Sequence, residues 1–417
     1  MHLYEIPLIF VLIGLVFYVV LAGADFGAGF WQLFAGRGAA GTRVREHAHK
    51  SMAPVWEANH VWLIFVLTVT WTAYPAAFGA IASTLSIPLF IAAVGIVLRG
   101  AAYALRAGAA DGREQRLIDT VFSLSSILTP FALGTIIGAL AARRVPVGNA
   151  AGHLLSSWTG PISIFVGVLA VSTSAYLAAV FLAADAARAQ DTELETSFYR
   201  RALGSGIFAG AVAIAGLVVL HSDEHPLYHR LLDSDALAAL IVSMLAGVAT
   251  LALVATRRFE SARYGAALAV SAVIAGWALA QNPVLLSDLT VRQAAAPHET
   301  LVVVIVAVLA GGLILFPSLA LLFRLTLAGH LDEGESHSAP TRVPAVGSLL
   351  AVSASGLLAR AAGACLLAGF GFLTLAEAGW AHAIGVIALL GFIVLGFLAD
   401  VPSHLAQMDH DDLAPRA

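Results

Sequence analysis

Four ionisable side chains lie beside or inside long apolar stretches of this sequence: Asp25, Glu57, Arg99 and Asp119. A charged group at membrane depth costs roughly 3 kcal/mol on insertion scales, so each of the four needs a physical reason. A guanidinium can keep one carboxylate ionised while a second carboxyl group exchanges protons near neutral pH. These residue types together are typical of a route for protons.

Two of the carboxylates have informative surroundings. Asp25 lies in GADFGAG, whose glycines allow a neighbouring helix to approach closely. Glu57 follows Pro54, which favours the first turn of a helix, so we expect Glu57 in an opening turn where the helix dipole stabilises an anion. With successive helices running in opposite directions, we expect all four ionisable residues at similar depth on the cytoplasmic half, in one cluster.

Each residue also has a plainer interpretation. Glu57 and Asp119 could be water-facing acids of a first helical turn, and Arg99 could extend to the interface from the end of its span. His60 follows Glu57 by three residues and could be its hydrogen-bond partner.

The segment around Glu57 carries four further candidates for contact with a quinone or with a partner subunit: Trp56, Asn59, His60 and Trp62. Tryptophans at such a position are more often interfacial anchors and packing groups than ligand contacts.

The chain as a whole is much more apolar than a soluble domain. Of its 417 residues, 59% are hydrophobic and 12% are charged, and the mean hydropathy is +0.88, whereas soluble domains carry about 25% charged residues. Apolar runs long enough to cross about 30 Å of hydrocarbon recur throughout, so the first is interpreted as a spanning helix and not as a cleaved signal. The predicted fold is an all-α polytopic membrane protein with about eleven spans, at residues 6–34, 55–78, 80–105, 117–141, 161–184, 203–220, 236–256, 262–281, 300–323, 347–375 and 382–399.

The distribution of basic residues supports this count, because Lys and Arg accumulate in cytoplasmic loops. Seventeen of the 22 fall in alternate loops on one side, four fall on the other side, and Arg360 lies inside a proposed span. The N-terminus is therefore expected outside and the C-terminus in the cytoplasm. The segment HLDEGESHSAPTR (330–342) is polar and interrupted by proline, which predicts a core at 1–329, a cytoplasmic linker at 330–346 and an appended helix pair with a short tail at 347–417.

Several classes of function are disfavoured. A single cysteine, Cys365, excludes a disulfide within the chain and a cysteine-based metal site. His60 and the outer-edge His221 are the only histidines in the first nine proposed spans, and Met244 is the only deep methionine, so axial haem ligands on facing helices are not expected. No Walker loop or HExxH pattern occurs, the net charge is -4, and the scattered basic residues form no patch for nucleic acid. We expect this chain to bind neither haem nor metal.

Five stretches together resemble subunit II of the bacterial cytochrome bd quinol oxidases: GADFGAG, APVWEANHVWLIF, VLRGAAYALR, the stretch from RLIDT to LTPFALG, and AQNPVLLSDLTVRQAAAPHETL. The resemblance runs from the N-terminus to about residue 325. Its most specific part is the run Trp56-Glu57-Ala58-Asn59-His60-Val61-Trp62, with Asp25 upstream and Arg99 downstream.

The resemblance implies nine helices in two four-helix bundles plus one, in a bacterial inner membrane. It also implies a haem-bearing partner, subunit I, which would carry the b- and d-type haems and the quinol site. The complex would oxidise quinol, reduce O2 to water and take its protons from the cytoplasm. By motif, Asp25, Glu57, Arg99 and Asp119 match functional polar positions of the family, and a structural quinone is a candidate ligand of this subunit.

The chain departs from the family after residue 329, where members usually end and this sequence adds a linker and two spans. These spans could occupy the flank on which small accessory subunits sit. Two other functions remain open: a secondary transporter, although Pro88, Pro130 and Pro317 do not pair as inverted halves would require, and a purely scaffolding membrane subunit.

Overall fold

The computed structural model describes residues 2–36, 38–106, 112–327, 357–375, 380–381, 383–392 and 394–395. The side chains of residues 53–54, 56–58, 112–113, 234, 316, 319–327, 357–359, 370–371 and 373–375 lie outside that description. The chain divides into two compact units, Met1–Ser318 and Leu319–Ala417.

The described secondary structure consists almost entirely of helices. The elements are η1 Leu3–Glu5, α1 Ile6–Leu33, α2 Ala39–Ala73, α3 Pro75–Thr84, α4 Ser86–Arg106, α5 Gly112–Ala141, α6 Pro161–Arg188, α7 Thr192–Asp223, α8 His225–Leu231, α9 Ser234–Ala255, α10 Phe259–Gln281, β1 Val284–Leu286, β2 Leu289–Thr290, α11 Val291–Ala294, α12 His298–Leu327 and α14 Leu357–Leu375. Within the described residues, eight helices are long and apolar enough to cross a membrane. The predicted all-α polytopic membrane fold is confirmed.

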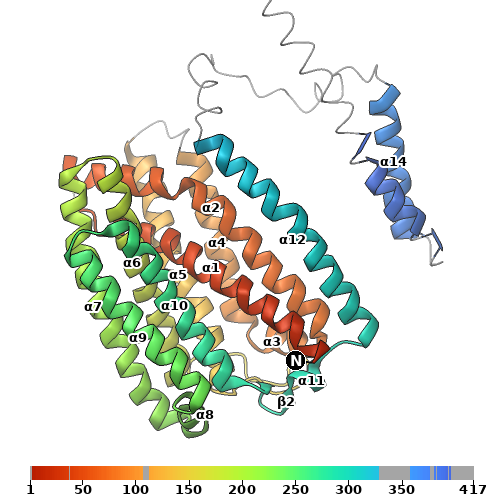
Figure 1. Ribbon diagram of the computed structural model, residues 1–417, viewed down its shortest axis with the longest axis horizontal. Helices are drawn as coiled ribbons and strands as arrows, with labels where there is room; N and C mark the ends of the chain where they lie inside the picture. Colours follow the sequence, from red (N-terminus) through yellow and green to blue (C-terminus); the bar gives the residue numbers. More distant parts are fainter. Residues whose placement is uncertain are drawn as a thin grey trace, which may run out of the picture. The chain divides into compact units, whose positions relative to one another are not determined.

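The long helices of the first unit form two groups. In one group α1 packs against α2 and α5, and α5 packs against α4; in the other, α6 packs against α7 and α10, and α9 packs against both α7 and α10. Contacts of α6 with α1 and α5 join the groups, and Figure 1 shows the helices of both lying side by side. Helix α12 lies at the edge of this unit, where its apolar stretch is only 11% buried.

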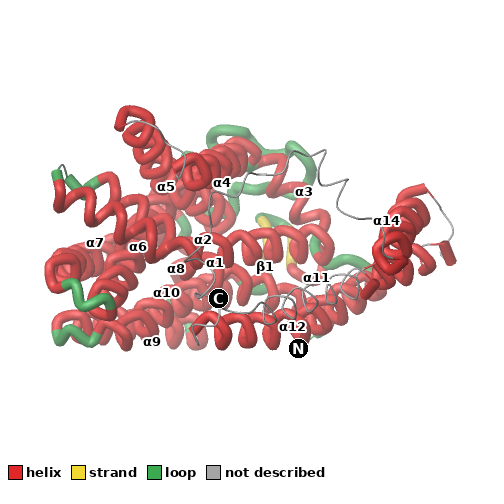
Figure 2. Tube along the Cα trace, turned by 90° about the horizontal axis from the view of Figure 1, so that it is seen from above, coloured by secondary structure: helices red, strands yellow, loops and turns green. Residues whose placement is uncertain are grey.

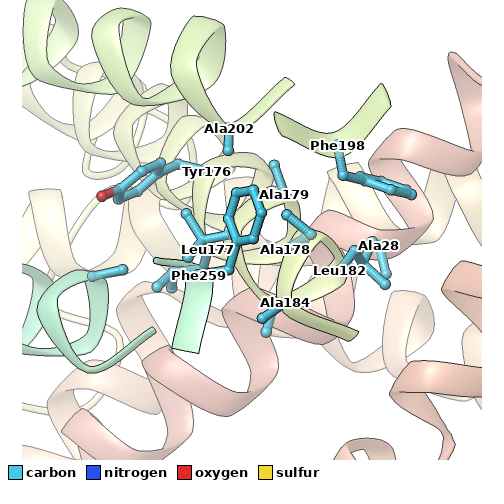
Figure 3. Close-up of a cluster of buried hydrophobic side chains, with 14 of the residues drawn as sticks. Ala28, Tyr176, Leu177, Ala178, Ala179, Leu182, Ala184, Phe198, Ala202 and Phe259 are labelled. Atoms are coloured by element: carbon cyan, nitrogen blue, oxygen red, sulfur yellow. The ribbon is translucent and has the colours of Figure 1, made fainter. Parts of the chain in front are cut away.

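The interior is built around the middle of α6, where small and aliphatic residues alternate tightly. Leu177, Val180 and Leu182 are fully buried, and so are the alanines between them. Figure 3 shows this stretch of α6 surrounded by Phe198 and Phe259 from the neighbouring helices. Because the alanines add so little width, α1, α7 and α10 can all approach α6 closely.

A short hairpin closes one end of the helices. Strand β1 pairs antiparallel with β2, and the two form the yellow segments of Figure 2. After α11, the Ala296 N–H donates a hydrogen bond of 2.8 Å to the Ala73 carbonyl at the end of α2. This hydrogen bond fixes the connection into α12 against the first group of helices.

Several predicted boundaries are wrong, among them the start of the sixth span, which was expected at residue 203, whereas α7 begins at Thr192. The second span was expected to begin at residue 55, but α2 begins at Ala39. The segment 39–54 is polar yet contains alanine, glutamate and arginine, which are good helix formers, so the helix extends beyond the apolar region. A separate short helix, α3, overlaps the end of the second expected span (55–78) and the start of the third (80–105), and α4 begins after a break at Leu85. Pro88 has no N–H to donate to the carbonyl four residues earlier, at the end of α3.

In the second unit, α14 packs against a helix at Ala383–Phe392. A Cβ added at Gly369 would lie 2.7 Å from the Leu389 side chain, and one added at Gly391 would lie 3.4 Å from Cys365 Sγ. The absence of side chains on these glycines permits the close approach. The predicted linker, the tail, residues 347–356 of the tenth predicted span and part of the last predicted span lie outside the described residues.

Candidate functional site

A buried ion pair joins α1 to α4. Asp25 and Arg99 are each 1% exposed. The Arg99 guanidinium donates from Nη2 to Asp25 Oδ1, from Nε to Oδ2 at 3.2 Å, and from Nη2 to the Asp25 carbonyl oxygen at 2.8 Å. A guanidinium that contacts both carboxylate oxygens offsets much of the cost of burying each charge.

Side chains from α2 and α5 complete this centre. Asn59 Nδ2 donates to Asp25 Oδ2 at 3.2 Å, and Arg99 Nη1 donates to Ser126 Oγ. The face of the guanidinium lies over the Phe122 ring at 4.1 Å and over the Phe26 ring at 5.2 Å. Four helices therefore contribute one polar group each to a centre with aromatic walls.

Glycine on α1 makes room for this arrangement. A Cβ at Gly29 would collide with the Ser126 side chain and would lie 3.0 Å from Arg99 Nη1. Gly27 in the same GADFGAG stretch lies against the Ser174 carbonyl of α6. The glycines of this stretch thus allow close contact both with the Arg99–Ser126 side and with α6. Any larger residue at either position would move α1 away from its neighbours.

Asp119 does not join this centre, and the expected single cluster is corrected on this point. Asp119 Oδ1 lies 3.3 Å from Arg106 Nη1, in a pair whose side chains are 20% and 14% exposed. Arg106 follows Arg99 by seven residues on α4, and Asp119 precedes Ser126 by seven on α5. Two helical turns correspond to about 10 Å along the axis, so the two ion pairs form separate levels between α4 and α5.

The expectation for Glu57 is also corrected. Because α2 begins at Ala39, Glu57 lies in the middle of a continuous helix and not in an opening turn, so the argument from the helix dipole does not apply. The side chains of Glu57 and Trp56 lie outside the described residues.

The other candidates near Glu57 have contacts inside the protein. Asn59 is 2% exposed and bound to Asp25. Trp62 stacks on Phe17 of α1, with ring centroids 4.5 Å apart and an interplanar angle of 15°, while His60 is partly exposed. Asn59 and Trp62 thus hold α1 and α2 together.

Sequence reasoning missed Ser126 and His49. Ser126 is 1% exposed, and its spacing of seven residues from Asp119 was the available signal. His49 stacks on Tyr103 of α4, with ring centroids 4.3 Å apart. Burial, together with the positive charges of Arg106 and Arg99, lowers the pKa of His49 to about 4, so this imidazole is neutral at physiological pH. Its segment was expected to be a loop, which hid the contact.

The described residues contain no group of three or more His, Cys, Asp or Glu side chains that could hold a metal ion. The fixed charges of Asp25 and Arg99, the Asn59 amide and the Ser126 hydroxyl can bind and position protons, water or a polar group.

Comparisons with known proteins agree with one another. Residues 3–326 match the family model for cytochrome bd terminal oxidase subunit II. Among curated proteins, the chain is 29% identical over 164 residues to cytochrome bd ubiquinol oxidase subunit 2 of Bacillus subtilis, which covers 38% of this chain and 47% of that protein. It is 26% identical over 164 residues to cytochrome bd-I ubiquinol oxidase subunit 2 of Escherichia coli, covering 38% and 42%. The matched stretch thus spans less than half the length of these two relatives.

A solved structure gives a longer match. The structure of bd oxidase from Geobacillus thermodenitrificans contains a chain that is similar with a TM-score of 0.62 and 26% sequence identity. The match covers 78% of this chain and 99% of that chain.

Proposed function

The chain belongs to the cytochrome bd terminal oxidase subunit II family, and we propose that it is the haem-free subunit of a quinol:oxygen oxidoreductase. In this proposal it pairs with a haem-bearing subunit I, which holds the b- and d-type haems and the quinol site. Reduction of O2 to water consumes protons as well as electrons, and this subunit supplies a path for protons from the cytoplasm.

The buried Asp25–Arg99 pair is the observation that carries the proposal. A charge pair at 1% exposure has no contact with bulk solvent, and replacing such a pair with apolar residues is often neutral or stabilising. The stability of the fold alone therefore gives only a weak reason for the sequence to keep this buried ion pair. A fixed carboxylate with an amide and a hydroxyl group beside it can instead orient water and attract a proton into an otherwise apolar bundle.

Glu57 is the proton-accepting group in this proposal. It lies within one helical turn of Asn59 on α2, and Asn59 donates to Asp25, so the backbone of Glu57 lies at a depth close to that of the Asp25–Arg99 centre. Arg99 already compensates the charge of Asp25 through two carboxylate oxygens. A carboxyl group outside that pair is better suited to gain and lose a proton.

The proposed orientation places the Arg106–Asp119 level toward the cytoplasm and the β1–β2 hairpin outside. Ion pairs of arginine gather at the proposed inner end, for example Arg257 with Glu195 at 2.5 Å. This agrees with the preference of basic residues for the cytoplasmic side. Protons would then enter past Asp119.

A quinone contact at Trp56, Asn59, His60 and Trp62 is not part of this proposal. Asn59 is bound to Asp25, and one face of the Trp62 ring is stacked on Phe17, so contacts within the protein account for these two side chains without a ligand. The quinol site is assigned to the partner subunit.

Substitution in the assembled complex tests the proton path. We expect Glu57→Gln and Asp25→Asn each to slow oxygen reduction by at least about tenfold, because general acid and base groups contribute factors of this size or more. Glu46→Gln is the matched control, since Glu46 is exposed on the same helix. Turnover, proton uptake and haem absorption are measured together, so that loss of haem is distinguished from loss of proton delivery.

The rival functions predict other results. Wild-type turnover at normal haem content in both Glu57→Gln and Asp25→Asn would favour a scaffolding subunit. Purification without a haem-bearing partner would favour a transporter.

A further inference from the structure

Several buried polar atoms near the Asp25–Arg99 pair have no hydrogen-bond partner among the described residues. On the proposed inner side these are both amide atoms of Gln32 and His49 Nδ1. On the other side they are Tyr18 Oη and Thr129 Oγ1. A buried polar atom without a partner is costly, and in proteins such atoms commonly bind ordered water.

Gln32 is the most informative of these residues. It is 3% exposed, and neither its Oε1 nor its Nε2 has a partner among the described residues. It follows Asp25 by seven residues and Gly29 by three on α1, so all three share one helical face. Gly29 on that face lies against Ser126 and Arg99. Seven residues correspond to about 10 Å along a helix, so Gln32 lies near the depth of the Arg106–Asp119 level, on the face of α1 that carries Asp25 and Gly29.

His49 approaches that interior from α2. Its ring stacks on Tyr103, and Tyr103 lies 6.1 Å from Phe122, the ring beneath the Arg99 guanidinium. Tyr103 and Phe122 lie between the two ion-pair levels, because Tyr103 lies between Arg99 and Arg106 on α4. The His49 ring thus lies in the interval of about 10 Å between the levels, and Gln32 lies at the inner end of that interval.

We propose that Gln32 and His49 hold a column of ordered water that connects the Asp119–Arg106 level to the Asp25–Arg99 centre. Gln32 can both donate and accept hydrogen bonds, and neutral His49 can do the same through its two ring nitrogens. Each water accepts one proton and releases another, so one proton enters and one leaves with no other reactant. Gln32 and His49 are positioning residues, and this inference rests on the proposed proton path.

Substitution of Gln32 in the assembled complex tests the column. Gln32→Leu keeps a similar volume but removes both polar atoms, and we expect turnover to fall about fivefold to tenfold with unchanged haem content, the effect of one lost hydrogen bond on a rate. The solvent deuterium isotope effect on turnover should rise, because proton delivery becomes limiting. Gln32→Asn, which retains the amide, should recover most of the rate, and His49→Leu should reproduce the defect.

Gln281→Leu is the matched control. Gln281 is also buried with an amide nitrogen that lacks a partner, but it lies at the far end of α10 from this interior. The Gln281→Leu substitution should therefore leave turnover and the solvent deuterium isotope effect unchanged.

A structure of the wild-type complex at a resolution that shows water gives an independent test. We expect water density within hydrogen-bond distance of the Gln32 amide, and apolar packing around that amide would overturn the proposal. Wild-type turnover in both Gln32→Leu and His49→Leu would also overturn it. If Asp25→Asn and Glu57→Gln slow the enzyme while these two variants do not, only the column is wrong; if none of the four does, the proton path itself fails.

Discussion

Loss of Arg99 should destabilise the protein more than loss of any exposed arginine. Arg99→Leu removes donors to both Asp25 carboxylate oxygens, to the Asp25 carbonyl and to Ser126. Among the described residues, the Asp25 carboxylate, 1% exposed, would keep only the hydrogen bond from Asn59. Breaking a buried pair from one side typically costs about 3–5 kcal/mol, a large fraction of a stability of about 5–15 kcal/mol.

A double variant distinguishes the interaction between Asp25 and Arg99 from the contacts that each makes with other residues. Arg99→Leu with Asp25→Leu removes both charges, so no carboxylate is left buried without its partner, and most of the lost free energy of unfolding should return. The single variants should each be much less stable than the double variant. Unfolding midpoints measured in detergent, with Asp25→Leu alone as the fourth corner, give the coupling free energy.

An exposed pair provides the control. Arg43 contacts Asp191 at 2.6 Å with its side chain 44% exposed, so Arg43→Leu should leave the unfolding midpoint close to that of the wild type. If the effects of Arg99→Leu and Asp25→Leu simply add in the double variant, the two side chains do not stabilise each other and the reasoning is refuted.

Two further variants test helix packing and helix capping. Gly27→Ala should destabilise the protein by about 1–3 kcal/mol, because the added Cβ would collide with the Ser174 carbonyl. Gly204→Ala is the control, because nothing lies within 4 Å of a Cβ added there. Equal unfolding midpoints for the two variants would contradict this prediction. Asp191 accepts a hydrogen bond of 3.1 Å from the Leu194 N–H, and this bond is the main cause that holds its pKa below the ordinary 3.8. The stability advantage of the wild type over Asp191→Ala should therefore be full above pH 3.8 and decline as the pH falls through the lowered pKa, as thermal unfolding in a pH series would show.

Several features of the candidate site could be recognised before the structure was known. Asp25 and Arg99 stand out because a charge within an apolar run has a cost that depends only on its local surroundings. The partner of each charge could not be recognised in this way. Asp119 and Asp25 are both plausible partners of Arg99 by depth. Nothing in the sequence around Asn59 indicates whether its amide binds Asp25 or a ligand.

The extent of α2 shows a second limit. A hydropathy pattern ends where the apolar run ends, but a helix can continue into water whenever its residues favour it. His49 was assigned to a loop for this reason, and its contact with Tyr103 and its place beside the arginines of α4 could not be foreseen.

The sequence by itself determined that this is a helical membrane protein, where most spans lie and which charges are unusual, because bilayer thickness and the need to satisfy backbone hydrogen bonds act on each segment separately. Only the tertiary structure decided that Arg99 pairs with Asp25 and that Arg106 takes Asp119. Those pairings depend on the rotation and axial offset of helices distant in the sequence, and glycine contacts such as that of Gly29 with Ser126 set both.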